Sequence, residues 1–363
     1  MTTNIPASVF ARLKNWAKAN RQDLQYVLFR YANERILYRL SAVPEAHAFV
    51  LKGATMFLAW TGSTHRATKD IDLLGYGDPS PERLVALFRR VAAVPCDDDG
   101  VVFDADSVES APIREGLEYG GVRITVRGRL DSAALSVQID VGFGDVVDPD
   151  PVDIELPTLL PIAAPRLRSY PREVVLAEKL QAMVNLGREN SRMKDFYDVW
   201  LLLGTVTFDE RLGQAIGSTF ARRRTPLPAS MPDALTDEFA ADPAKRTQWA
   251  AFLRRSMSEQ RPELAEVIAA IRAGIWPVLQ AERGRALPLA AVEQHLRERE
   301  GDYAGNRAAA RLVTFTGADG APWVERGVLR DRKLAQGEAL AELTRLSQEM
   351  GLYDDPPVKR ETE

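Results

Sequence analysis

The chain has 363 residues, of which 45% are hydrophobic and 27% are charged, and this composition is ordinary for a folded protein of about two domains. A net charge of −4 at pH 7 excludes a protein whose whole surface binds nucleic acid, although a local basic face is still compatible with it. A single cysteine, Cys96, excludes an intramolecular disulfide and a thiolate metal cluster, and the three scattered histidines do not favour a histidine-based zinc site.

The first segment, residues 7–41, has apolar residues at helical spacing and is predicted to be helical. Arg30, Arg35 and Arg39 lie within this pattern, and we interpret them as a solvated helix face rather than as a row that faces a substrate. No secretory signal is visible and no apolar run approaches the ~18 residues of a membrane span. We therefore expect a cytoplasmic protein with no membrane partner.

Residues 46–150 have the texture of an α/β core. "FVLKG" predicts a short strand that ends in glycine, "ATMFLAW" the start of a helix, and "IDLLGYGD" a strand that breaks at its glycines. "SPERLVALFRRVAAV" predicts an amphipathic helix with Ser80 as its N-cap. "GVRITVRGRL" and "LSVQIDVGFGD", joined by "DSAA", predict a β-hairpin.

The chain becomes mainly helical after about residue 151. A proline-rich, irregular stretch runs to about residue 171, and "REVVLAEKLQAMVNLG" then predicts a helix that ends at Gly187. "SRMKDFYDVWLLLGT" predicts another helix. The tail contains a β-like patch, "RLVTFT" and "APWVERGVL", followed by a predicted helix, "GEALAELTRLSQEM", and a charged end predicted to be disordered.

The expected fold class is therefore α/β (α+β), with a small mixed sheet flanked by helices and a mainly helical C-terminal region. Four parts are predicted: N-terminal helices at 1–45, an α/β core at 46–150, a helical domain that completes the site at 151–281, and an extension of unassigned role at 282–363.

Two acids, Asp70 and Asp72, lie on one face of the predicted strand "IDLLGYGD" because side chains alternate along a strand. Two carboxylates about 4 Å apart repel by roughly 4 kcal/mol at an effective dielectric constant near 20, so they need a cation, a shared proton or exposure to water. A third acid, Asp140, lies mid-strand in "SVQIDVGFGD". If the two strands are neighbours, three carboxylates converge and can hold two Mg²⁺ or Mn²⁺ ions. A solvated aspartate pair is the alternative.

A glycine turn precedes these acids. Lys52, Gly53 and Ala54 end one predicted strand and open a helix, where backbone N–H groups can approach a phosphate. Taken alone, this feature has low specificity because many strand–glycine–helix turns bind nothing.

The combination of these motifs resembles the polymerase-beta-type nucleotidyltransferase superfamily and, more specifically, the AbiEii/AbiGii toxin family. The first motif of the family matches Lys52, Gly53, Ala54, Arg66, Thr68, Asp70 and Asp72. The second matches Glu178, Lys179, Arg192, Lys194, Asp195 and Asp198. The resemblance covers about residues 1–280. Ala54 departs from it, since the superfamily usually has serine or glycine there, and Thr55 could supply part of the missing hydroxyl contact.

The resemblance implies three overlapping sets of site residues. The metal ligands would be Asp70, Asp72 and Asp140. The NTP would be bound by Lys52, Gly53, Ala54, Thr55, Arg66, Thr68, Lys179, Arg192 and Lys194. The catalytic residues would be Asp70, Asp72, Lys179, Asp195 and Asp198. The roles of Asp195 and Asp198 stay open between fixing Lys179, contacting a ribose and, for Asp198, accepting a proton from the acceptor. A plain salt bridge between packed helices is the alternative for this second motif.

The implied function is a metal-dependent toxin that transfers a nucleoside monophosphate from an NTP to an acceptor and releases pyrophosphate. The resemblance further implies a toxin–antitoxin or abortive-infection (phage defence) system and a cognate antitoxin. MenT-like relatives modify tRNA 3′ ends, which makes tRNA the first acceptor to consider. Arginine clusters such as 222–224 suggest an RNA-binding face, with Phe220 able to stack a base, or else ordinary solvated helix faces. Two alternatives are transfer to a protein or small molecule, and an inactive nucleotide-binding or partner-binding module.

Overall fold

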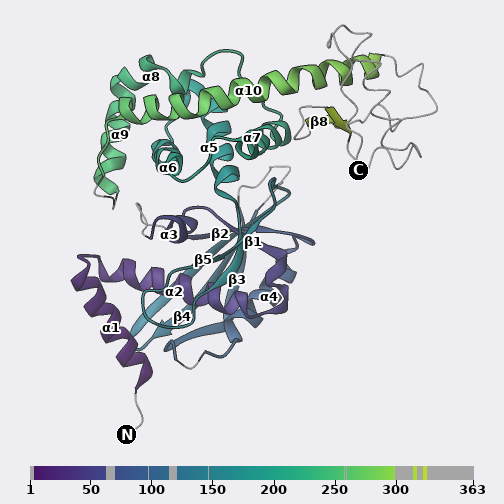
Figure 1. Ribbon diagram of the computed structural model, residues 1–363. Coiled ribbons are helices and arrows are strands. Elements are labelled where there is room, and N and C mark those ends of the chain that lie inside the picture. The colour runs from purple at the N-terminus through teal and green to yellow at the C-terminus, as the bar shows by residue number, and fades with distance from the viewer. Residues whose placement is uncertain are drawn as a thin grey trace, which may run out of the picture.

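The structure is a computed structural model that describes residues 4–62, 70–96, 98–113, 121–145, 147–256, 258 and 260–298, together with two short strands at 314–316 and 322–324. Side chains are described as far as residue 283. The chain forms two lobes, a lower lobe built on a β-sheet and an upper lobe built from helices (Figure 1). The mixed α/β fold with a helical C-terminal region agrees with the prediction.

The N-terminal segment forms two helices, α1 (Ile5–Ala19) and α2 (Leu24–Ser41). The side chain of Asp23 caps α2 by accepting a hydrogen bond from the backbone N–H of Tyr26 at 3.0 Å. The predicted helical character is confirmed, but the interpretation of the arginines is wrong for two of them. Arg35 and Arg39 are almost fully buried because both bind Asp99, at 3.1 and 2.5 Å.

The lower lobe contains one seven-stranded mixed sheet with the order β3-β4-β5-β2-β1-β7-β6. The pairs β2–β5 and β1–β7 are parallel, and the other neighbouring pairs are antiparallel. The strands are β1 (Phe49–Lys52), β2 (Asp70–Gly75), β3 (Val101–Ile113), β4 (Gly121–Leu130), β5 (Ala133–Phe143), β6 (Val152–Glu155) and β7 (Arg166–Ser169).

The strands β1, β2, β4 and β5 confirm the sequence predictions, as do the short helix α3 (Met56–Thr61) and the helix α4 (Pro81–Ala93). Ser80 stands at the N-cap of α4, but its hydroxyl binds Asp78 and makes no capping bond. Three strands were not predicted. β3 is polar and interrupted by a bulge, while β6 and β7 are short and lie in the stretch interpreted as irregular.

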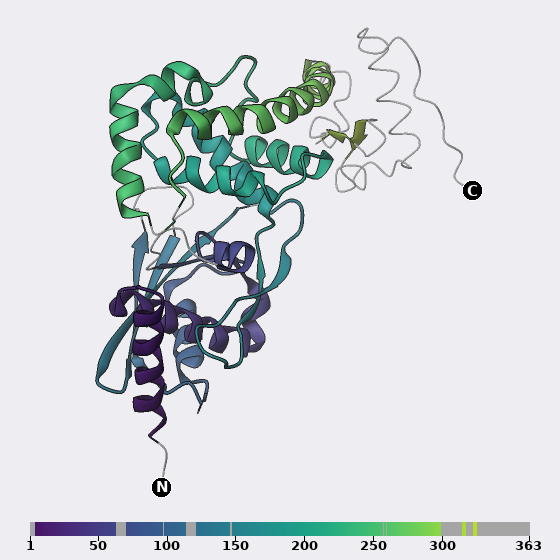
Figure 2. The ribbon, with the colours of Figure 1, turned by 60° about the vertical axis from the view of Figure 1, so that its left-hand side comes forward.

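Buried and accessible positions alternate along β5, and this alternation defines the two faces of the sheet. Val137, Ile139 and Val141 are buried in the core on the face that carries α1, α2 and α4, whereas Gln138 and Asp140 are partly exposed on the opposite face (Figures 1 and 2). The same alternation places the core residue Ile71 of β2 beside Ile139.

The upper lobe packs helices around α5, which ends at Gly187 with a positive φ of 47°, as predicted for a C-cap. Its helices are α5 (Arg172–Leu186), α6 (Met193–Leu203), α7 (Glu210–Arg222), α8 (Asp237–Ala241), α9 (Pro243–Arg255) and α10 (Leu264–Glu298). Three short 3₁₀ turns complete the described helices: η1 (Pro44–Ala48), η2 (Gly187–Glu189) and η3 (Asp233–Leu235).

One helix in the described part of the chain is long and apolar enough to cross a membrane, over Leu264–Arg283 of α10. Val267, Ile271 and Ile275 of this stretch are fully buried, and α10 packs against α6, α7 and α8. A single helix of this kind, with 33% of its window buried, is weak evidence for a membrane span.

The tail contributes β8 (Thr314–Thr316) and β9 (Pro322–Val324), which pair as an antiparallel hairpin and confirm the predicted β-like patch. The predicted helix at 337–350 and the charged C-terminal end lie outside the described residues.

Candidate active site

Four charged residues form a row across the middle of the sheet, on the face opposite α1, α2 and α4. Strand pairing places Arg123 of β4 opposite Asp140 of β5, Asp140 beside Asp72 of β2, and Asp72 opposite Lys52 of β1. Directly paired residues on neighbouring strands project from the same face. This charge row (Arg123, Asp140, Asp72, Lys52) thus has two acids between two bases.

Asp70 lies on the same face, two residues before Asp72, and its strand partner is Gln138. The side chains of Asp70, Asp72 and Asp140 are all partly exposed. The predicted neighbourhood of the two acidic strands is therefore confirmed, and we call this surface the acid face (Asp70, Asp72, Asp140).

Asp140 forms a bidentate ion pair with Arg123. Its Oδ1 accepts from Arg123 Nε at 2.8 Å and its Oδ2 accepts from Arg123 Nη2 at 2.7 Å. The Gln138 amide lies against the same guanidinium and, with its oxygen turned toward Arg123, accepts from both nitrogens at 3.1 Å. The hydrogen bond to Asp140 raises the pKa of Arg123 against the opposing effect of burial, and the charges of Asp140, Asp70 and Asp72 act in the same direction as that bond.

Sequence reasoning did not single out Arg123, although a signal for it exists. The hairpin β4–β5 closes with Leu130 opposite Ala133. Counting back from this turn in a regular antiparallel pair places Arg123 opposite Asp140.

Gly53 shapes the turn beneath Asp72. Its φ is +77°, and a Cβ atom there would lie 2.0 Å from Oδ2 and 2.9 Å from Cβ of Asp72. Glycine is therefore needed for two reasons: it tolerates this backbone conformation, and its missing Cβ leaves space for the Asp72 carboxylate. Ala54 and Thr55, which complete the glycine turn (residues 53–55), are buried. The predicted nucleotide-binding residues Arg66 and Thr68 lie outside the described residues.

The side chain of Lys52 binds Asp145, which lies outside the acid face. Its Nζ donates to Asp145 Oδ2 at 3.0 Å and lies 6.0 Å from the centre of the Tyr170 ring. The Tyr170 hydroxyl donates to the same Asp145 oxygen at 3.4 Å. Asp145 and Tyr170 were not predicted as part of the site, because only the folded chain brings the end of β5, the end of β1 and the start of α5 together.

The second motif forms a buried ion cluster between α5 and α6. Lys179 Nζ lies 2.9 Å from Asp195 Oδ1 and 2.6 Å from Asp198 Oδ2, and Arg192 Nε lies 2.7 Å from Asp195 Oδ2. Both aspartate side chains are fully buried, whereas Lys179 keeps 16% of its side chain exposed. Burial alone would lower the pKa of Lys179, but the charges of Asp198 and Asp195 outweigh burial and raise it.

This geometry bears on the three roles left open for the aspartates. Both carboxylates hold the ammonium group of Lys179, so the arrangement fits the fixing of Lys179 better than proton transfer to an exposed acceptor. Lys194 is exposed on α6, and Arg192 is half-exposed beside Asp195.

The two motifs meet through charged side chains where the lobes join. Glu178, next to Lys179, pairs with Arg223 at 2.9 Å. Burial raises the pKa of Glu178 against the charge of Arg223, and the charges of Asp145 and Lys52 also act on this carboxyl group. Arg222 donates to the backbone oxygen of Gly144, just after β5. The end of α7 therefore lies close to the end of the acid-bearing strand.

Phe220 is 1% exposed in the core of the upper lobe, so its predicted role in stacking a base is wrong. The apolar pattern of α7 places it on the same buried side as Leu212 and Ile216.

Divalent metal chemistry fits two residues of the acid face better than three. Within the part of the chain that the structure describes, no group of three or more His, Cys, Asp or Glu side chains has an arrangement that could hold a metal ion. Asp140 is held by Arg123 with both oxygens, whereas Asp70 and Asp72 lie on the neighbouring strand of the same face. Two carboxylates suit Mg²⁺, which commonly takes one or two carboxylates and completes its shell with water and substrate phosphates.

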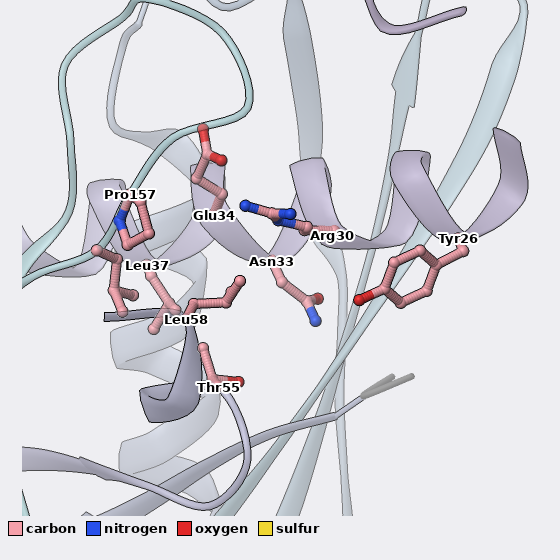
Figure 3. A pocket seen from close by; sticks show the side chains of 9 residues that line it. Tyr26, Arg30, Asn33, Glu34, Leu37, Thr55, Leu58 and Pro157 are labelled. Carbon is pink, nitrogen blue, oxygen red and sulfur yellow. The ribbon is translucent and has the colours of Figure 1, made fainter. Parts of the chain in front are cut away.

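A pocket lies beside the glycine turn on the helix side. Figure 3 shows Asn33 and Glu34 of α2 lining it together with Thr55 and Leu58. Burial raises the pKa of Glu34 to about 7, against the hydrogen bond from the Leu159 N–H and the charge of Arg35. Thr55 belongs both to the wall of this pocket and to the glycine turn, so the pocket residues adjoin the turn.

Comparisons with known proteins place the chain in a family. The sequence matches the family described as nucleotidyl transferase AbiEii toxin, type IV toxin–antitoxin system, over residues 35–273. No curated relative matches the chain.

Two solved structures from Helicobacter pylori resemble the fold. The protein JHP933 has a TM-score of 0.41 and 14% identity, and the alignment covers 72% of this chain and 97% of that one. A protein described as a candidate nucleotidyltransferase has a TM-score of 0.39 and 13% identity, with 70% and 92% covered. The family match spans the glycine turn, the acid face and the Lys179 cluster, and the chain belongs to the AbiEii family of nucleotidyltransferase toxins of type IV toxin–antitoxin systems.

Proposed function

We propose that this nucleotidyltransferase is metal-dependent, that it acts at the acid face, and that its acceptor is RNA, with tRNA as the first candidate. The observation that carries the proposal is the side-by-side pairing of Asp72 with Asp140 on an open sheet face beside the Gly53 turn. Asp70 and Asp72 would hold Mg²⁺ or Mn²⁺, and the ion would neutralise triphosphate charge and polarise the α-phosphate.

The residues of this chain then bind and orient the reactants. The glycine turn offers backbone N–H groups to the triphosphate, while Lys52 and Lys179 supply positive charge from the two lobes. The acceptor hydroxyl forms a bond to the α-phosphorus as the bond to the bridging oxygen breaks and pyrophosphate leaves. The hydroxyl proton passes to a carboxylate of the acid face or to water.

The RNA acceptor is supported by basic residues close to this face. Arg222 reaches the end of β5, Arg223 pairs with Glu178 in the middle of α5, and the neighbouring Arg224 is exposed. Such clusters bind phosphate backbones on a protein whose net charge is otherwise acidic. Phage defence, with a cognate antitoxin restraining the toxin, would be the cellular setting.

The acceptor is tested by incubating the purified protein with Mg²⁺ and each α-³²P-labelled NTP in turn, together with total tRNA, a protein extract or a pool of small-molecule acceptors. We expect label on tRNA with one or two of the four nucleotides. Label that appears only on protein or on small molecules would refute the RNA acceptor and favour the alternative substrates. Binding of NTP without release of pyrophosphate from any mixture would favour an inactive nucleotide-binding module.

A further inference from the structure

The charge row raises the question of why an acid that is expected to bind metal is already paired. Asp140 gives both of its oxygens to Arg123, at 2.8 and 2.7 Å, and only 15% of the Asp140 side chain is exposed. A two-pronged arginine–carboxylate pair has strong charge-assisted hydrogen bonds in a fixed geometry. The pair uses one acceptor site on each oxygen and places a positive charge there, so a metal ion that approached Asp140 would meet a cation already in place.

We propose that Arg123 is the fixed second cation of this active site. It holds Asp140 away from the metal, so that Asp70 and Asp72 bind a single divalent ion, and its remaining N–H groups bind the pyrophosphate portion of the NTP. The inference rests on the proposed metal-dependent transfer. In it, the Arg123 guanidinium supplies the positive charge that a second metal ion would otherwise supply.

The side chain of Arg123 is placed for this role. A guanidinium has five N–H donors, and the bonds to Asp140 use one edge of the group. Gln138 lies against that same edge. The side chain is 40% exposed, so part of the group is accessible to a ligand. Planar guanidinium groups bind phosphate oxygens in pairs, which suits a departing pyrophosphate.

Its neighbours make the assignment specific. Lys52, at the other end of the charge row, is engaged by Asp145. Arg127 lies four residues after Arg123, on the same strand and face, but it pairs with Glu109 where both side chains are more than half exposed. Arg127 therefore has the same chemistry away from the acid face and provides a matched control.

The first test counts bound ions by electron paramagnetic resonance, which reports free Mn²⁺ during a titration. We expect one Mn²⁺ per chain for the unmodified protein, for Asp140→Asn and for Arg127→Gln, and two for Arg123→Gln, in which Asp140 is released. Two ions in the unmodified protein that fall to one in Asp140→Asn would overturn the inference and leave the proposed function intact. No bound Mn²⁺ in the unmodified protein would instead refute the metal site of the proposed function.

The second test measures the dissociation constant of inorganic pyrophosphate by calorimetry at fixed Mg²⁺. Arg123→Lys keeps the charge but loses the planar pair of donors, and we expect binding about tenfold weaker. Arg127→Gln should bind like the unmodified protein. Unchanged binding in both Arg123→Lys and Arg123→Gln would overturn the phosphate role. Circular dichroism identifies the folded variants. If Arg123→Gln does not fold, Arg123→Lys still tests the phosphate role, because a lysine can keep the ion pair with Asp140.

Discussion

Replacing Gly53 by alanine tests the glycine turn against a built-in control. Gly53 and Gly62 have nearly the same backbone angle, with φ of +77° and +72°. A left-handed conformation costs a residue with a Cβ about 1–2 kcal/mol, so Gly62→Ala should lower the free energy of unfolding by that amount and Gly53→Ala by at least as much. Gly62 has no atom within 4 Å of an added Cβ, whereas Gly53 has three atoms of Asp72 within 2.9 Å.

The difference between the two variants therefore isolates Asp72. The clash includes the Cβ atom of Asp72, so a turn of the carboxylate alone does not relieve it and the side chain has to move with its backbone. We expect Gly53→Ala to weaken Mn²⁺ binding by about 10- to 100-fold, as is typical when a group that orients a metal ligand is changed. Gly62→Ala should bind Mn²⁺ normally. Equal Mn²⁺ affinity in the two variants, measured by titration with thermal melts alongside, would refute this reasoning.

Three further predictions concern buried charges. Burial raises the pKa of Glu34 from 4.5 to about 7, so between these pH values the folded protein binds more protons than the unfolded chain. The free energy of unfolding therefore falls as pH rises through that window, by up to about 3 kcal/mol. Glu34→Gln should flatten this dependence in urea unfolding between pH 5 and pH 8, and parallel profiles would contradict it. Asp99→Asn removes the carboxylate that the buried Arg35 and Arg39 share, although Arg35 keeps Glu34 at 3.5 Å. We expect a loss of about 3–5 kcal/mol in the same assay, and a loss below about 1 kcal/mol would argue against the buried cluster. Lys179→Ala should raise the KM for NTP at least about tenfold through the loss of a charged contact, and an unchanged KM in folded protein would leave Lys179 with a structural role only.

The parts of the site that are local in sequence could be predicted. A strand that ends in glycine, the Asp-apolar-Asp spacing and an acid in the middle of a later strand are patterns of a few residues each, and alternation along a strand fixes their faces. The expectation that the acids converge is confirmed by the pairing of β2 with β5.

The remaining features depend on which segments meet in space. Arg35 and Arg39 have the spacing of a solvated face, yet Asp99, about sixty residues later, turns them into a buried cluster. The strands β6 and β7 are only four residues long and lie in a proline-rich stretch, so their structure depends on the pairing of β7 with β1 and of β6 with β7. Asp145 joins Lys52 only because the end of β5 lies beside the end of β1.

The central claim is that the acid face performs the transfer, and the most direct test is release of pyrophosphate by Asp72→Asn. Asp153→Asn is the matched control, since it makes the same change at an exposed aspartate on β6, at the edge of the sheet. With tRNA, Mg²⁺ and the preferred NTP, we expect release to vanish in Asp72→Asn and to continue unchanged in Asp153→Asn, while both variants stay folded. Full release by folded Asp72→Asn would contradict the account and place the chemistry elsewhere on the protein.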